Sequence, residues 1–431
     1  MARTAAVPVI LEEEYESRRA DLAKELKPNS LFLLLSAKPQ QRSHDTEFPY
    51  RQNSNFYYLT GFKEENAALV IVRGKKAFNT YLFVQKKEKQ LELWTGKRLG
   101  EKRAKKLFHV DNVFTSELLH EKVLGLLSKS KNFYYDFNVT DTRLDALREK
   151  AKSLLAHYNA ATLVERARLV KSPAEIRLIK HAISITKEAH HRAMKLSKQL
   201  TTEKELQAEI EYVFTKNGAY SDAYTSIVAS GNAANTLHYI ENNKALKDGE
   251  LILIDAGCEY EYYASDITRT IPANGKFSKA QKELYEMILN VEKEIISMVR
   301  VGVLRSHLQK RAQELLCRGL VSLGILEGEC KKLLKKGKLN KYYPHGIGHW
   351  MGLDVHDQAP YKDAKGKEIP LCEGMVLTIE PGIYIDKNDK SVPKKYRGIG
   401  IRIEDDILVR GSGYENLSAA IAKEVQEIES M

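Results

Sequence analysis

The sequence contains few cysteines, and their spacing excludes several classes of protein. The four residues, Cys258, Cys317, Cys330 and Cys372, lie far apart and never form a C-x-x-C pair. This spacing argues against a disulfide framework and against a zinc ribbon. A reducing compartment, the cytoplasm, is therefore the expected location.

Long apolar runs are also missing from the sequence. No run reaches the roughly 18 apolar residues that cross a bilayer, so no membrane partner is expected. The apolar patch Val7–Leu11 is short and is followed by three glutamates, which is unlike a secretory signal or an Arg-rich transit peptide. Low-complexity segments and internal repeats are absent too. We therefore expect a soluble globular protein.

Length and charge define the broad class. A chain of 431 residues with 43% hydrophobic and 29% charged residues predicts two globular domains. The net charge of +11 arises partly from lysine runs such as Lys86–Lys89 and Lys331–Lys338. Because no nucleic-acid motif accompanies these runs, we interpret them as solvated surface and expect no nucleic-acid partner.

Residues 1–168 predict an N-terminal α/β domain. Residues 11–27 have a helical pattern, and further helical patterns lie at 100–108 and 115–127. Short β-type runs bounded by turn residues lie between them. These runs are 31–35, 68–72, 80–84 and 133–137.

A helix start marks the second domain, residues 169–431. In KSPAE, Ser172 is a candidate N-cap, Pro173 lies at the first helical position, and Glu175 completes a capping box. Similar signals predict helix starts at Thr202–Glu205, Ser278–Gln281 and Ser306–Gln309. From Tyr342 onward the pattern changes to short strands and turns. Helices and strands in separate runs predict an α+β domain.

The stretch Ile252–Thr270 (ILIDAGCEYEYYASDITRT) contains two aspartates in an unusual setting. Asp255 ends the apolar run Leu251–Ile254, and Asp266 lies beside a second β-type run. A buried carboxylate is costly unless it is paired or binds a metal. For either aspartate alone, a salt bridge would be a sufficient explanation.

Further acidic and imidazole groups follow in the same domain. Glu380 ends the run Met375–Ile379, and Glu404 ends the run Ile399–Ile403. Three histidines, His345, His349 and His356, lie in HGIGHW and GLDVHD. Carboxylates that share a site repel one another unless cations are present. A ligand set of oxygens with one imidazole favours Mn, Fe or Co. Two such ions about 3.5–4 Å apart would lower the pKa of a water to about 7, which predicts metal-assisted hydrolysis.

These segments resemble the metal-dependent peptidases of the pita-bread fold, which include methionine aminopeptidase, prolidase, creatinase and aminopeptidase P. The aminopeptidase P (Xaa-Pro aminopeptidase) branch is matched most fully, and the match spans both domains. The matching segments are YRQNSNFYYLTGF (50–62), ELWTGKRLG (92–100), KSPAEI, LHYIENN (237–243), the Asp255–Asp266 stretch, HGIGHWMGLDVHD, VLTIEPGIYI and YRGIGIRIEDDI.

The resemblance implies the fold and the activity. It implies a creatinase/prolidase-like α/β N-terminal domain and an α+β pita-bread catalytic domain. The implied reaction is hydrolysis of the bond between an N-terminal residue and a following proline, by a hydroxide that bridges two metal ions. The implied metal is Mn²⁺, with Co²⁺, Fe²⁺ or Zn²⁺ as alternatives. The implied assembly is a homodimer or homotetramer, to which the N-terminal domain contributes, together with access to the active site.

The resemblance also implies a role for each site residue. The metal ligands would be Asp255, Asp266, His349, Glu380 and Glu404, with Asp266 and Glu404 bridging. Glu380 would also act as acid and base, His356 would stabilise the tetrahedral intermediate, and His345 would line the proline side of the cleft. The substrate contacts would be His238, Arg402 and Tyr384. We interpret Trp94 in two ways: it packs in the core or at an interface, or it contacts the active site of a neighbouring subunit.

Three alternatives remain open at this point. A prolidase would use the same chemistry on dipeptides only. A catalytically inactive relative used for binding would lack metal ligands, whereas this chain retains all five positions. Creatinase-type hydrolysis without metal is disfavoured for the same reason. The segment QAPYKDAKGKEIPL departs from the bacterial pattern and offers no clear counterpart to an arginine that contacts substrate in some relatives.

Overall fold

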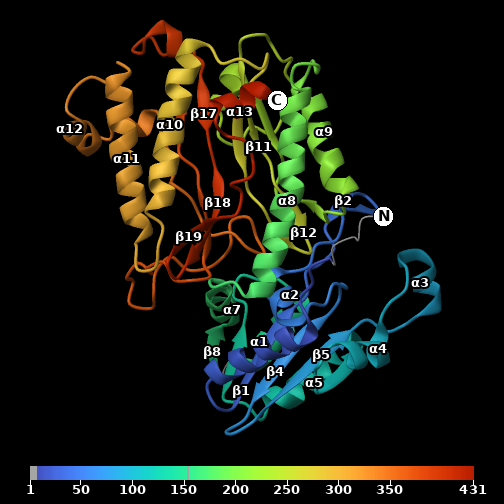
Figure 1. The fold of residues 1–431 in the computed structure, drawn as a ribbon. Coiled ribbons are helices and arrows are strands. Elements are labelled where there is room, and N and C mark those ends of the chain that lie inside the picture. Colours follow the sequence, from blue (N-terminus) through green and yellow to red (C-terminus); the bar gives the residue numbers. More distant parts are fainter. Residues whose placement is uncertain (1–6, 153–154) are drawn as a thin grey trace. The chain divides into compact units, whose positions relative to one another are not determined.

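The computed structural model describes residues 7–152 and 155–431 (Figure 1). By its internal contacts the chain forms two compact units. One is Ile10–Arg168, and the other is Leu169–Met431 together with the described residues ahead of Ile10. Within the described ranges, every helix is too short or too polar to cross a lipid bilayer.

The first unit is built on one mixed sheet of six strands. The strand order is β6-β5-β4-β1-β7-β8, in which β1 pairs antiparallel with β4 and parallel with β7. The strands are β1 (Ser30–Leu35), β4 (Ala68–Arg73), β5 (Phe78–Val84), β6 (Asn112–Thr115), β7 (Asn132–Tyr135) and β8 (Ala156–Asn159), and the separate ribbon β2 (Gln41–Ser43) with β3 (Thr46–Glu47). The predicted β-type runs therefore form β1, β4, β5 and β7.

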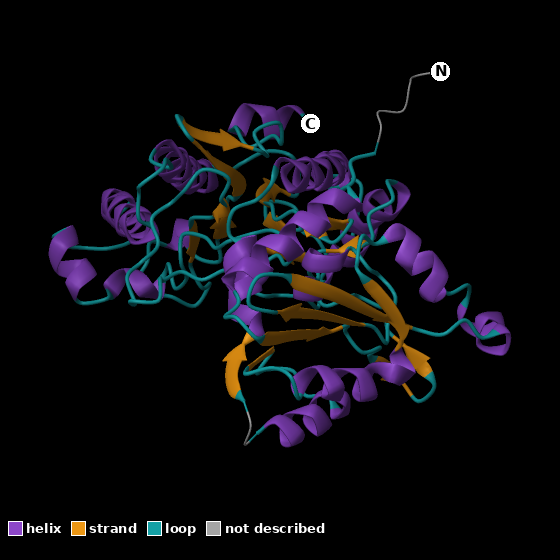
Figure 2. Ribbon diagram, turned by 90° about the horizontal axis from the view of Figure 1, so that it is seen from below, coloured by secondary structure: helices purple, strands orange, loops and turns teal. Residues whose placement is uncertain are grey.

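Helices cover both faces of this sheet (Figure 2). The helices of this unit are α1 (Glu12–Glu25), α2 (Ser54–Thr60), α3 (Lys89–Thr95), α4 (Gly100–Leu107), α5 (Leu119–Leu127), α6 (Thr142–Ala151) and α7 (Ala160–Arg168). Of these, α3 has no buried residue and lies apart from the sheet (Figure 1). All six positions of β1 are buried, as expected for a central strand that is covered on both faces. On one face, Leu31 and Leu33 pack against Val123 of α5 and Leu147 of α6.

The helices of the second unit begin largely where the sequence predicts. They are α8 (Pro173–Leu196), α9 (Glu203–Lys216), α10 (Lys279–Ser297), α11 (Arg305–Ser322), α12 (Cys330–Lys335) and α13 (Val425–Ser430). Capping boxes form at Ser172, Thr202 and Ser278, which confirms those predictions. The predicted start at Ser306 is wrong, because α11 already begins at Arg305 and the Ser306 N–H donates to the Glu368 carboxylate instead.

Short antiparallel strands lie between two helix pairs in this unit. Figure 1 shows α8 and α9 on one side of the strands and α10 and α11 on the other. The strands are β9 (Ser221–Asp222), β10 (Ile227–Ser230), β11 (Leu251–Asp255), β12 (Cys258–Tyr260), β13 (Tyr263–Ala264), β14 (Thr268–Pro272), β15 (Val376–Ile379), β16 (Gly382–Tyr384), β17 (Gly400–Arg402), β18 (Asp405–Arg410) and β19 (Gly413–Asn416). This is the expected α+β organisation.

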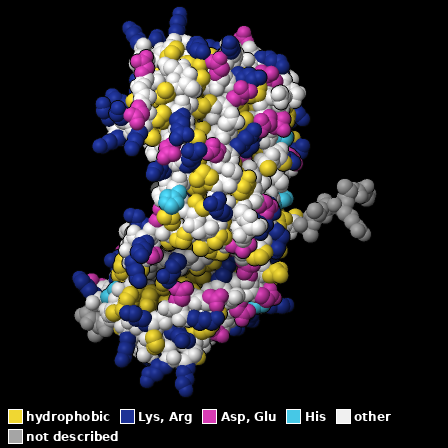
Figure 3. All heavy atoms as spheres, turned by 60° about the vertical axis from the view of Figure 1, so that its left-hand side comes forward, with side chains coloured by type: hydrophobic (Ala, Val, Ile, Leu, Met, Phe, Trp, Pro, Cys, Tyr) yellow, Lys and Arg dark blue, Asp and Glu magenta, His cyan; other side chains and the backbone are white. Residues whose placement is uncertain are grey.

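Charged side chains of both signs are interspersed on the surface. Figure 3 shows Lys and Arg side chains scattered among Asp and Glu over the face that it draws. On that face the excess positive charge is therefore spread out, as the interpretation of the lysine runs as solvated surface requires.

Candidate active site

Two paired strands bring the two aspartates of the 252–270 stretch into one region. Strand β11 pairs antiparallel with β14, and Asp255 lies opposite Thr268. Asp266 precedes β14 by two residues, and its backbone N–H donates to the Asp406 carboxylate at 3.1 Å. The short hairpin of β12 and β13 lies between them in sequence. The stretch therefore forms a pair of strands with a short hairpin inserted between them.

The loop that carries His349 is fixed against β15. The His349 N–H donates to Thr378 Oγ1 at 3.1 Å, and the Thr378 N–H donates to the His349 carbonyl at 2.9 Å. A Cβ on Gly348 would lie 1.8 Å from the Thr378 carbonyl oxygen, so only glycine allows this approach. The strand thereby determines where the imidazole lies.

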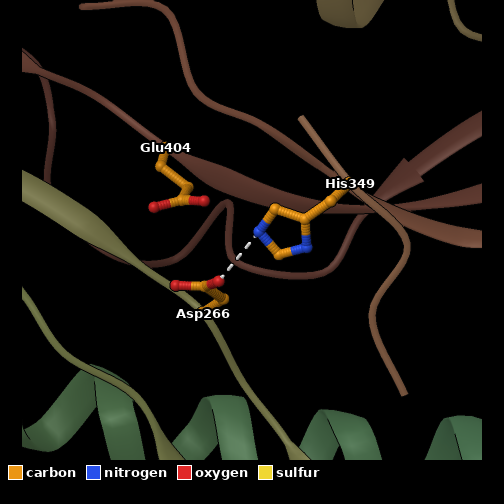
Figure 4. Close-up of side chains that lie close together, drawn as sticks. All are labelled: Asp266, His349 and Glu404. Atoms are coloured by element: carbon orange, nitrogen blue, oxygen red, sulfur yellow. Dashed lines mark ion pairs between the residues drawn. The ribbon is translucent and has the colours of Figure 1, made fainter. Parts of the chain in front are cut away.

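Three of the predicted metal ligands meet in this structure. One ligand atom from each of Asp266, His349 and Glu404 lies within 4.8 Å of the others. Figure 4 shows both carboxylates facing the same edge of the imidazole, with His349 Nε2 at 3.3 Å from Asp266 Oδ2. The other ring nitrogen, Nδ1, lies 3.0 Å from the Trp350 carbonyl oxygen. That contact makes Nδ1 the protonated nitrogen and leaves Nε2 free to bind a metal.

The electrostatics of this group fit a divalent cation. Glu404 Oε1 is buried and has no hydrogen-bond partner. Burial and the nearby Asp266 raise the pKa of Glu404 well above its usual range. Burial disfavours protonation of His349, yet Asp266 raises its pKa to about 9. A buried carboxylate oxygen without a partner, beside a second acid and an imidazole, is the chemistry that a divalent cation fits.

Glu380 lies at the edge of this trio. Its Oε1 is 3.8 Å from His349 Nε2, and its Oε2 is 3.9 Å from His345 Nδ1. Burial raises the pKa of Glu380 to about 7. A carboxyl group that titrates near neutral pH can both take and release a proton there.

Asp255, the fifth predicted ligand, is held differently. Its Oδ1 accepts a hydrogen bond from the Tyr224 hydroxyl at 2.6 Å, and its Oδ2 pairs with Arg402 Nη2 at 2.5 Å. Arg402 also donates to the Tyr384 hydroxyl at 2.9 Å and to Thr268 Oγ1 at 3.1 Å. Burial favours loss of the Arg402 proton, but Tyr384 and Asp255 raise its pKa well above the usual range.

A cavity of about 600 Å³ opens beside these ligands. All five predicted ligands line it, together with His238, His345, His356 and Arg402. His345 Nε2 lies 2.8 Å from the Tyr384 hydroxyl, and burial lowers the pKa of His345 to about 4. The rings of His349 and His356 have centroids 4.1 Å apart, and burial lowers the pKa of His356. His345 and His356 are therefore neutral at pH 7.

Two residues at the site were not predicted. Tyr224 holds Asp255, and Thr268 donates to Glu404 Oε2 at 2.6 Å. Thr268 could have been found, because it lies two residues after Asp266 and alternate residues of a strand share a face. The sequence around Tyr224 offers no such signal.

Buried acids around one imidazole, beside a cavity lined by further histidines, define a metal-dependent hydrolase. The profile of metallopeptidase family M24 matches residues 177–411, and that of the aminopeptidase P N-terminal domain matches residues 15–134. The chain belongs to metallopeptidase family M24.

Individual relatives match along nearly the whole chain. A Xaa-Pro aminopeptidase of Haemophilus influenzae is 40% identical over 97% of both chains. Xaa-Pro aminopeptidase 3 of Homo sapiens is 37% identical over 93% of this chain and 80% of its own length. The solved structure of E. coli aminopeptidase P with the inhibitor Pro-Leu has a TM-score of 0.93, 38% identity and 98% coverage of both chains. These matches confirm the predicted two-domain fold, with a pita-bread catalytic domain.

Proposed function

We propose that this enzyme is a Xaa-Pro aminopeptidase, a metal-dependent exopeptidase that releases an N-terminal residue preceding proline. The trio of Asp266, His349 and Glu404 at the cavity carries the proposal, because it supplies metal-ligand chemistry on a chain similar to Xaa-Pro aminopeptidases along its length. An X-Pro bond is a tertiary amide whose proline has no N–H. A site that binds the scissile carbonyl through metal ions does not depend on that missing donor.

Five residues would hold two divalent cations, namely Asp255, Asp266, His349, Glu380 and Glu404. Such ions supply a Lewis acid for the scissile carbonyl and lower the pKa of a water. The oxygen-rich ligand set favours Mn²⁺. A zinc-substituted form of the E. coli relative has been solved with product, so metal content has to be measured on this protein directly.

The chain's own residues would move the protons. Glu380, which lies 3.8 Å from His349 Nε2 at the edge of the trio, would take a proton from the attacking water and pass it to the proline nitrogen as the C–N bond breaks. A neutral His356 retains one N–H that can donate to the oxygen on which negative charge develops.

The remaining polar residues of the cavity would bind the substrate. His238 and His345 would face the proline side, and Tyr384 would fix the His345 ring through its 2.8 Å contact. Arg402 would hold Asp255 in place through their ion pair. Because both Asp255 oxygens already accept hydrogen bonds from the protein, recognition of the substrate amine by this carboxylate needs a direct test.

A panel of peptides with the Mn²⁺-loaded enzyme tests this function. We expect release of alanine from Ala-Pro-Ala and little release from Ala-Ala-Pro, while N-acetylated Ala-Pro-Pro should resist cleavage if the free amine is required. Cleavage of Ala-Pro alone would identify a prolidase instead. Equal cleavage of Ala-Ala-Pro would contradict the proline requirement.

We also propose that residues 1–168 mediate assembly into a homodimer or homotetramer and shape access to the active site. On α3, Leu93 and Trp94 are 83% and 85% exposed, and apolar side chains exposed to this degree mark contact surfaces when they lie together. The Trp94→Ala variant should sediment as a smaller species than the wild type, and an unchanged mass would contradict this role. The four free cysteines support our placement of the enzyme in the cytoplasm.

A further inference from the structure

Lys171 at the start of the second unit forms a fully buried ion pair. Its Nζ lies 3.0 Å from Asp357 Oδ2, and each of the two side chains is 1% exposed. A buried ion pair rarely adds stability, because both charges lose their hydration. The position of this pair therefore matters more than its contribution to the free energy of unfolding.

Asp357 connects the pair to two histidines of the cavity. It directly follows His356, and its backbone N–H donates to the Trp350 carbonyl at 2.9 Å. The same carbonyl lies 3.0 Å from His349 Nδ1. The Trp350 carbonyl oxygen therefore contacts both the His349 ring and the backbone N–H of Asp357, and the second contact closes the turn at 350–357.

The turn packs directly onto the ion pair. A Cβ on Gly352 would lie 2.7 Å from Asp357 Oδ2 and 2.9 Å from Lys171 Cε. The Gly352 carbonyl also accepts from the Ala264 N–H at 2.9 Å. Gly352 therefore leaves no room for a side chain between the turn and the ion pair, so the turn is packed closely against both charged side chains.

Lys171 is anchored on its other side. Its N–H donates at 2.9 Å to the carbonyl of Gly374, which lies shortly before β15. The next residue, Ser172, caps α8 in a capping box with Glu175. Lys171 thus has a fixed backbone and presents its charge to a turn that carries cavity residues.

We propose that Lys171 and Asp357 are positioning residues that set the place of the His356 imidazole in the cavity. The inference rests on the proposed function, in which His356 acts on the developing negative charge. Loss of the Asp357 carboxylate would leave Lys171 buried without its counter-ion, and loss of Lys171 would remove the cation that lies 3.0 Å from Asp357. The turn at 350–357 would shift to bring the remaining charge to water or to another group. The imidazole would move with the turn.

The test uses the metal-loaded full chain and hydrolysis of Ala-Pro-Ala. We expect Lys171→Met and Asp357→Asn each to lower kcat about tenfold or more, as outer contacts of metal sites do, with KM changed less than about threefold. Both metal equivalents should remain bound. In a His356→Ala background, either change should lower kcat by less than about twofold further, because the group being positioned is already absent.

A control ion pair lies on α8, the helix that follows Lys171. Arg192 pairs with Glu209 at 2.5 Å outside the cavity and is partly exposed, and Arg192→Met should leave kcat unchanged. If Lys171→Met does not fold, Asp357→Asn decides, because the amide keeps the shape of the side chain and removes only the charge that neutralises Lys171.

The outcomes separate this inference from the proposed function. If His356→Ala lowers kcat but both pair variants retain it, the inference alone is overturned. The inference is also overturned if the fold-losses of kcat from a pair variant and from His356→Ala multiply in the double variant. It is likewise overturned if a pair variant loses activity because it has lost metal. If His356→Ala leaves kcat unchanged, the role of His356 and this inference both fall.

Discussion

Glu404 and Asp405 are neighbours in sequence, yet they belong to two buried charge clusters that are built in opposite ways. Glu404 Oε1 has no partner, and burial raises its pKa well above the usual range. Asp405 is also fully buried, but it pairs with Arg269 at 2.7 Å and with Lys423. For Asp405, burial is outweighed by these two cations, so its pKa is lowered.

The difference shows what distinguishes a functional acid from a structural one. Both residues are buried acids, so burial alone does not separate them. Asp405 forms ion pairs with two cations of the protein. Glu404 shares its surroundings with Asp266, and its pKa stays well above the usual range although the nearby Arg402 lowers it. A buried acid without a cation of its own is where a metal ion fits.

The largest expected effect on turnover comes from removing one acid of the cluster around Glu404. Glu404→Gln and Asp266→Asn should each lower turnover by more than about 100-fold, beyond the loss that outer contacts cause, because the proposed metal site would lose one of its carboxylate ligands. The thermal midpoint of the metal-free variants should not fall. Activity assays with metal analysis check this, and near wild-type turnover with one metal bound would contradict it.

In the cluster around Asp405, removal of the acid should lower stability and largely spare turnover. Asp405→Asn leaves Arg269 buried without its carboxylate and should lower the free energy of unfolding by about 3–5 kcal/mol. Denaturant unfolding measures this loss. Turnover per metal-loaded folded molecule should remain within about tenfold of the wild type, a smaller loss than for the ligand variants. A stable Asp405→Asn variant with no activity would break the comparison.

Thr268 tests how the first cluster is oriented. Its hydroxyl donates to Glu404 Oε2 at 2.6 Å, and Thr268→Val removes that donor without changing the shape of the side chain. Metal affinity should fall about 10–100-fold, as for other outer contacts of metal sites. Titration of the metal-free variant measures this, and an unchanged affinity would show that the hydroxyl does not orient Glu404.

Replacement of Asp222, a buried acid outside the cavity, should have the smallest effect. It tests whether a raised pKa alone marks a functional acid. Burial and Glu211 raise the pKa of Asp222 to about 7, but it does not line the cavity. Because its folded pKa is raised, the stability that it contributes is present at low pH and lost as pH rises through about 7. Asp222→Asn should therefore melt like the wild type near pH 4, about the ordinary pKa of an aspartate, and a few degrees higher at pH 8, with unchanged turnover. A loss of turnover would show that Asp222 serves the site after all.

Local signals in the sequence predicted most of the elements. The capping boxes at Ser172, Thr202 and Ser278 form as expected, because each satisfies its own helix terminus with residues three apart. At Ser306 the same local pattern failed. There a distant carboxylate, Glu368, accepts from the Ser306 N–H, and no local pattern records such a tertiary contact.

The residues of the candidate site were predicted from residue type and resemblance, but the hydrogen bonds and ion pairs between them were not. The sequence pointed to Asp266, His349 and Glu404, which the structure brings together. It did not show that Arg402 occupies one Asp255 oxygen or that Arg269 neutralises Asp405. These partners lie 147 and 136 residues apart in sequence and on strands of different sheets, so only the tertiary packing of those sheets brings them into contact.

One titration tests the central claim most directly. Mn²⁺ is added stepwise to metal-free wild type and to Glu404→Gln, and binding is recorded together with release of alanine from Ala-Pro-Ala. The wild type should bind two equivalents and gain activity as they bind, whereas Glu404→Gln should bind less and remain inactive. Full activity of the wild type in the presence of a chelator, or full activity of Glu404→Gln, would contradict the account.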